Sequence, residues 1–188
     1  MQLPVELRAL IAQLDNADAD ARSMVNGLSE ELGHWSPSPG SWSASECLHH
    51  LALTNHAYIA AMKPAADRAR VRGRLRSRPA KPGFVGSWFL RSIEPPVKTR
   101  FKAPPTIQPH HAPPLAEAFA AFTASQQPVR EFLLTNADLD LATIHFPNPF
   151  IRGVRFSLAT GLHVIPAHDR RHLCQARNAL QQAEASRH

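Results

Sequence analysis

The feature that most constrains the fold is a series of apolar stripes at helical spacing, separated by proline-rich segments. In the first stripe, apolar residues recur every three or four positions over about six turns, at Leu7, Leu10, Leu14, Ala17, Ala21, Met24 and Leu28. This spacing places all of them on one face of a helix, which has to be buried against another element. It predicts one long amphipathic helix that ends near Gly33.

The second predicted helix has a clear start. Ser43 and Glu46 form the S-x-x-E pattern of a capping box, in which the two residues cap the first turn reciprocally. Trp42 and Cys47 are placed as the hydrophobic staple that accompanies such a box. Because proline usually ends a helix, we expect this one to stop near Pro64.

Two more long helices follow later in the chain. The third carries a stripe over 115–133, with a kink expected at Pro128, where the ring removes a backbone hydrogen bond. The fourth covers about 157–185 and should bend at Pro166 for the same reason. A short helix is expected around 85–93, and no segment shows a convincing strand pattern.

These helices predict an all-α chain, residues 1–188, that forms a single domain built as a four-helix bundle. The connection between the second and third helices, the irregular and proline-rich crossover over 63–114, is long enough to run the length of the bundle. It therefore lets these two helices run parallel, which gives an up-down-down-up order. An apolar fraction of 44% suits a globular domain of this length.

Two histidines near the end of the chain have the spacing of a metal site. His168 and His172 lie four residues apart in HDRRH, within the fourth predicted helix. One helical turn separates them, so both imidazoles lie on the same face and could bind one divalent ion. The spacing is a weak signal by itself, and a third ligand has to come from elsewhere. The segment WSASECLHHL, over 42–51, offers candidates.

Together, the two motifs resemble those of the DinB/YfiT-like superfamily of metalloenzymes. WSASECLHHL is similar to W-S-x-x-E-x-x-x-H-L in the second helix of that family, and HDRRHLCQAR is similar to H-x-x-x-H-x-x-Q in its last helix. The long crossover also matches, so the resemblance covers essentially the whole chain. It implies that His50, His168 and His172 bind a divalent metal ion, most commonly nickel or zinc. His49 misses the register, because adjacent helix positions point about 100° apart.

The same resemblance implies two types of activity on a small-molecule substrate. One is hydrolysis by metal-bound water, and the other is transfer of a low-molecular-weight thiol, such as bacillithiol or mycothiol, to an electrophile. Three imidazoles without a carboxylate would leave a coordination position open for water or substrate. The sequence identifies no catalytic residue. The alternative is a helical interaction domain without catalysis, whose metal site is vestigial or structural.

Other residues could border such a site. Glu46 is more consistent with capping than with catalysis, Gln175 could orient a ligand or pack between helices, and His145 could lie near the mouth of the bundle. Asp169 and Arg170 are expected to face solvent. Five further histidines show no constellation: His34, His56, His110, His111 and His188.

Basic residues are concentrated in the crossover. Residues 63–102 hold 12 Lys and Arg against two acidic residues, a net charge of +10, whereas the rest of the chain holds 9 basic and 13 acidic residues, or −4. The run RARVRGRLRSR has arginines at 70, 72, 74, 76 and 78. It permits a nucleic-acid- or phosphate-binding module. However, no interleaved aromatic residues or nucleic-acid motif accompany it, which favours a solvated loop. The crossover could also line the site entrance and steer anionic substrates.

The cysteines and the hydropathy bear on location. Cys47 and Cys174 lack C-x-x-C spacing and fall in predicted helices, so reduced thiols and a cytoplasmic location are expected. No apolar run approaches the length of a membrane span, and the N-terminus lacks a signal-peptide pattern. We therefore expect no membrane partner. Whether the chain forms a homodimer stays open.

Overall fold

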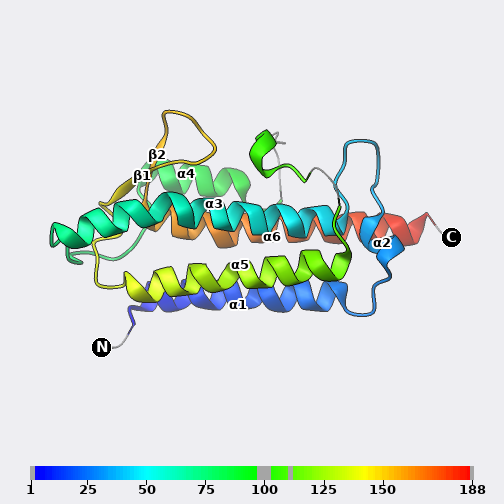
Figure 1. Ribbon diagram of the computed structural model, residues 1–188, viewed down its shortest axis with the longest axis horizontal. Coiled ribbons are helices and arrows are strands. Elements are labelled where there is room, and N and C mark those ends of the chain that lie inside the picture. Colours follow the sequence, from blue (N-terminus) through cyan, green and yellow to red (C-terminus); the bar gives the residue numbers. More distant parts are fainter. Residues whose placement is uncertain (1–2, 97–102, 110–111, 187–188) are drawn as a thin grey trace.

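The computed structural model describes residues 3–96, 103–109 and 112–186. Four long helices, α1 (Val5–Val25), α3 (Ala44–Val71), α5 (Leu115–Thr135) and α6 (Leu158–Ala185), lie alongside one another on the long axis of the molecule (Figure 1). α3 packs against α5 and α6, and α1 packs against the same two helices. The prediction of an all-α fold is confirmed.

Short elements join the long helices. α2 (Glu30–His34) follows α1, while α4 (Phe84–Ile93) and a single 3-10 turn, η1 (Pro105–Ile107), belong to the crossover. β1 (His145–Pro147) and β2 (Arg155–Ser157) form an antiparallel pair directly before α6. The short helix expected around 85–93 is α4. The expectation of no strand is wrong, because three-residue strands are too short for alternating hydrophobicity to reveal them.

Two helix ends differ from the prediction. The first helix does not continue to Gly33: α1 ends at Val25, Gly27 follows with a φ of +73°, and α2 starts after Ser29, whose side chain caps it. The apolar stripe misleads here because Leu28 still packs against the core from the connecting turn.

The second helix does not stop at Pro64 either, since α3 continues to Val71. Pro64 and Ala60 are both exposed. The Ala60 carbonyl, which loses its intrahelical hydrogen bond to the proline, can therefore bond to water instead. As a consequence, the first arginines of the basic run lie on a helix rather than in a loop.

Close packing between α6 and its neighbours depends on two glycines. A Cβ built on Gly161 would lie 2.8 Å from the Met62 sulfur of α3 and 2.8 Å from the Phe146 ring of β1. A Cβ on Gly86 of α4 would lie 2.4 Å from the Thr160 hydroxyl of α6. These contacts are possible only without a side chain: the one at Gly161 allows α6 to approach α3, and the one at Gly86 allows α4 to approach α6. Among the described residues, no helix is long and apolar enough to cross a bilayer.

Candidate metal centre

Three histidines meet between α3 and α6. His50 comes from α3 and is 2% exposed, while His168 and His172 come from consecutive turns of α6, the first half-buried and the second buried. One candidate ligand nitrogen from each lies within 4.8 Å of the others. The ring centroids are 5.1 Å apart for His50 and His168, 4.6 Å for His50 and His172, and 4.5 Å for His168 and His172.

The separation of two of these nitrogens fits a shared ion. Two nitrogens that each lie about 2.1 Å from a tetrahedral zinc are about 3.4 Å from one another. The Nε2 atoms of His50 and His168 are 3.4 Å apart. The three side chains are therefore close enough to share one ion, and neutral imidazole is a donor type that nickel and zinc accept.

The crossover fixes the orientation of His50. The Nδ1–H group of this residue donates a hydrogen bond of 2.6 Å to the backbone carbonyl of Ile107, in η1. Because a carbonyl can only accept, this bond places the ring proton on Nδ1 and leaves the Nε2 lone pair free to bind a metal. We expected the crossover to line the site. It does so through η1 and not through the arginine run.

The end of the crossover is attached next to the histidines. Ser45 of α3 donates its hydroxyl proton to the Pro113 carbonyl, and His34 of α2 donates from Nε2 to the same carbonyl over 2.9 Å. The backbone N–H of Leu115 donates to Glu30 over 2.8 Å. The sequence did not predict this attachment. Every residue has a backbone carbonyl that can accept a hydrogen bond, so no residue type indicates such a contact.

An aromatic wall closes one side of the site. The Trp42 ring lies 4.6 Å from His50 and 5.5 Å from His172, measured between ring centroids. Trp42 also packs against the cluster that contains Cys47, as a hydrophobic staple should. The staple was predicted from the sequence, but the contact with the two imidazoles was not.

Burial keeps the three imidazoles neutral. It lowers the pKa of His50 to about 4, an effect that the hydrogen bond to Ile107 partly offsets. Burial also holds the pKa values of His168 and His172 well below the ordinary range, and the neighbouring imidazoles lower them further. Neutral imidazole is the form that binds metal, so the three side chains are already in the metal-binding form at neutral pH.

Glu46 has the capping role that its pattern predicts. Its carboxylate accepts the Ser43 backbone N–H over 2.8 Å, and its own N–H donates to the Ser43 hydroxyl over 3.2 Å. The carboxylate is thus engaged at the start of α3, one turn before His50. Its contribution is to begin the helix that carries His50, and the catalytic interpretation has no support in the geometry.

Asp169 and Arg170 do not simply face solvent, contrary to expectation. Asp169 is fully buried and accepts a 2.8 Å hydrogen bond from Gln126 of α5, and burial raises the pKa of its carboxyl to about 7. Arg170 is half-buried and bonds Glu94 and Gln13. α6 packs against α1, α3 and α4, so neighbouring positions on different faces of this helix are at least partly buried.

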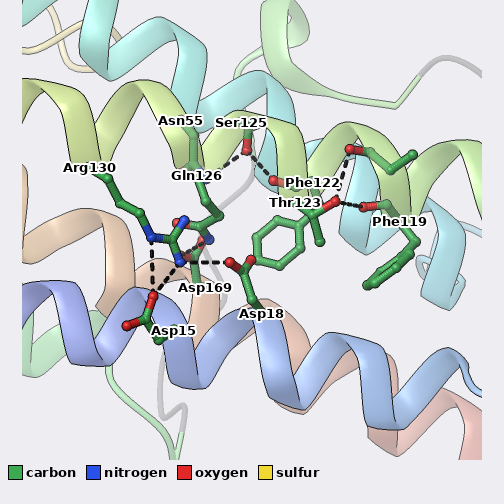
Figure 2. Close-up of polar contacts among 11 residues, drawn as sticks. Asp15, Asp18, Asn55, Phe119, Phe122, Thr123, Ser125, Gln126, Arg130 and Asp169 are labelled. Carbon is green, nitrogen blue, oxygen red and sulfur yellow. Dashed lines mark hydrogen bonds and ion pairs between the residues drawn. The ribbon is translucent and has the colours of Figure 1, made fainter.

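Figure 2 shows the polar groups that surround Asp169, the residue that follows His168 in α6. Asn55 of α3 donates to Ser125 of α5 over 3.0 Å, beside Gln126. On the outer side of the same region, Arg130 of α5 bonds Asp15 and Asp18 of α1. These contacts link all four long helices at the level of the candidate site.

The remaining candidates lie elsewhere or play minor parts. His145 is exposed in β1 and donates to the Thr143 carbonyl, with no contact to the three histidines among the described residues. His56 is exposed on α3. Gln175, one turn after His172 on α6, opposes the fall in the pKa of that histidine. His110, His111 and His188 lie outside the described residues.

Comparison with known families agrees with this geometry. No curated protein and no solved structure matches the chain. The family model of the DinB superfamily, a metal-binding family, matches residues 13–176. The match spans most of the chain and contains both histidine motifs. The chain therefore belongs to the DinB superfamily.

Proposed function

We propose that the protein is a metal-dependent enzyme in which His50, His168 and His172 hold a divalent ion. The observation that carries the proposal is the convergence of three buried or half-buried neutral imidazoles, with two Nε2 atoms 3.4 Å apart. Nickel and zinc suit this donor set best. When bound, such an ion supplies a Lewis acid with an open coordination position, which lowers the pKa of a bound water or thiol.

The reaction types that fit are hydrolysis and the transfer of a low-molecular-weight thiol. Both need a nucleophile, a water in the first case and a thiol in the second, whose pKa the ion lowers. Trp42 restricts solvent on one side, and the bond from His50 to Ile107 keeps the Nε2 lone pair directed at the ion position. His168, the most exposed of the three, marks the side from which a small substrate would approach.

The finer fold assignment belongs to the same proposal. We infer an up-down-down-up four-helix bundle in which α3 and α5 run parallel. The colour gradient of Figure 1 supports this order, because α3 and α5 run from the end near α2 toward the opposite end, and α1 and α6 run the other way. A cytoplasmic location is supported by the free thiols of Cys47 and Cys174.

Metal analysis of the purified protein tests the proposal. We expect roughly one equivalent of divalent metal per chain, removed by chelation and restored by nickel or zinc. His168→Ala should abolish binding, because two imidazoles alone bind such an ion much more weakly. His49→Ala is the matched control, a half-buried neighbour out of register, and should keep the metal.

An activity screen completes the test. Hydrolysis and thiol transfer should be measured on the same metal-loaded, metal-free and His168→Ala preparations. Activity that follows metal content supports the enzyme. If His49→Ala loses as much metal as His168→Ala, the ligand assignment is wrong. If the wild-type protein binds stoichiometric metal and no reaction depends on it, the structural-site alternative is the better one.

A further inference from the structure

A hollow lined by arginines lies at the end of α3 that is remote from the histidines. It has a volume of about 170 Å³. Its polar lining comes from Arg68, Arg72, Arg74, Thr143, His145 and Arg155, and none of its lining residues is acidic. The lining belongs to three separate parts of the chain: the last turns of α3 with the segment after it, the loop into β1, and β2.

The arginines that line this hollow differ in their ion pairs from the neighbouring arginines outside it. Three arginines outside it have carboxylate partners: Arg70 with Asp138 at 3.0 Å, Arg76 with Glu6, and Arg78 with Asp140 at 3.7 Å. The four arginines that line it have no carboxylate within ion-pair distance in the part of the chain that the structure describes. Within the described residues, no carboxylate therefore pairs directly with the arginines of the hollow.

Two of the lining guanidinium groups are held in place by neutral acceptors. Arg74 donates to the Thr143 hydroxyl over 3.1 Å, and Arg155 donates to the His145 carbonyl over 3.1 Å. These bonds orient the groups and leave their charge unneutralised. Each guanidinium has five N–H groups, so further donors remain for a ligand.

A purely structural reason does not explain the cluster. Basic residues in the last turn of α3 are favourable near the C-terminal end of the helix dipole. However, Arg68 and Arg72 are one turn apart, where like charges repel. The dipole also gives no reason for Arg155, which β2 brings to the same hollow.

We propose that this hollow binds a phosphate group, either as inorganic phosphate or on a small phosphomonoester. The planar fork of a guanidinium matches two oxygens of a phosphate, and four arginines line this hollow. The volume suits one small anion rather than a length of polymer. Arg72 and His50 are separated by about 30 Å along α3, so the site is distinct from the metal centre and does not depend on it.

Calorimetric titration with inorganic phosphate and with glycerol 3-phosphate, at constant ionic strength, tests the proposal. We expect saturable binding of one equivalent, with the tighter of the two ligands identifying the source of the phosphate group. Arg72→Gln combined with Arg155→Gln should weaken binding at least about tenfold, because each removes a charge-assisted hydrogen bond. The matched control is Lys81→Gln combined with Arg91→Gln, which removes the same charge from exposed positions outside the hollow.

Further outcomes decide against the proposal. The absence of saturable phosphate binding by the wild-type protein overturns it, as does an equal loss in the two double variants, which would indicate a general effect of net charge. Binding of a short DNA duplex with the same dependence on Arg72 and Arg155, but no binding of phosphate, replaces it with a nucleic-acid surface. Because the altered residues are exposed, melting temperatures should confirm that every variant is folded. Retained phosphate binding in His168→Ala would show independence from the metal.

Discussion

At the scale of single residues, the sequence predicts some features of the candidate site and misses others. The resemblance selects His50 and excludes His49, and the structure places His50, rather than His49, with His168 and His172. The carbonyl of Ile107 that orients His50 had no sequence signal, because any residue could supply it. Asp169 was misjudged because the complementary Gln126 lies on another helix, whose packing a single sequence does not show.

The capping box gives a prediction at this scale. Ser43→Ala should reduce the free energy of unfolding by about 0.5–2 kcal/mol, because the N–H of Glu46 loses its acceptor at the start of α3. Metal stoichiometry should be unchanged, since Ser43 is not a ligand. Urea unfolding and metal analysis measure the two effects. If Glu46→Gln were to leave stability unchanged and remove activity, the carboxylate would be catalytic after all.

At the scale of elements, the long helices were predictable from their stripes, whereas several of their ends were not. Pro64 does not stop α3 because the carbonyl it leaves unpaired is on the exposed face. The break after Val25 was hidden because Leu28 remains apolar and packed. The strands β1 and β2 contain too few residues for a periodic signal. For the two helix ends, tertiary packing or solvent exposure decided the outcome, whereas for the strands it was their length.

At the scale of elements, the prediction concerns Gly161, where α6 packs closely against α3. Gly161→Ala should lower the free energy of unfolding by about 1–3 kcal/mol, because its Cβ would overlap Met62 and Phe146. It should also weaken metal binding, since separating α6 from α3 moves His50 away from its two partners. Gly83→Ala is the control, because no atom lies within 4 Å of a Cβ at that position and its φ is ordinary. Comparable stability of the two variants would show that helix separation tolerates the methyl group.

At the scale of the whole molecule, the crossover connects both ends of the bundle. Its arginines at 70, 76 and 78 pair with carboxylates of α1 and of the segment after α5, so the expectation of a merely solvated loop is wrong for them. Its later part reaches the first turns of α3, where the Ile107 carbonyl accepts from His50 and the Pro113 carbonyl accepts from Ser45. Steering of substrate by Arg72, Arg74 and Arg76 is not expected, because about 30 Å of helix separates this end from His50 and charges are screened within about 8 Å.

Two groups of residues at the candidate site make opposite contributions to the pH dependence of the metal-free protein. The unfolded chain protonates His50 at its ordinary pKa near 6.5, whereas the folded chain does so only at about 4. The unfolded state therefore binds more protons as pH falls through this window, and this histidine makes the free energy of unfolding fall with acid. His168 and His172 act in the same direction. Asp169 acts in the other, because its folded pKa is raised from 3.8 to about 7.

Asp169→Asn isolates the second contribution. Between pH 4 and 7 the unfolded state ionises Asp169 while the folded state keeps the proton, so the wild-type protein loses stability from this group as pH rises. The amide of Asn does not titrate and still offers Gln126 an acceptor. Relative to the variant, metal-free wild-type protein should therefore lose up to about 4 kcal/mol of unfolding free energy over this range. Urea unfolding of both proteins at several pH values gives the difference, in which the contributions of the histidines and other carboxylates cancel. A difference that stays constant from pH 4 to 7 would mean that Asp169 ionises normally in the folded protein.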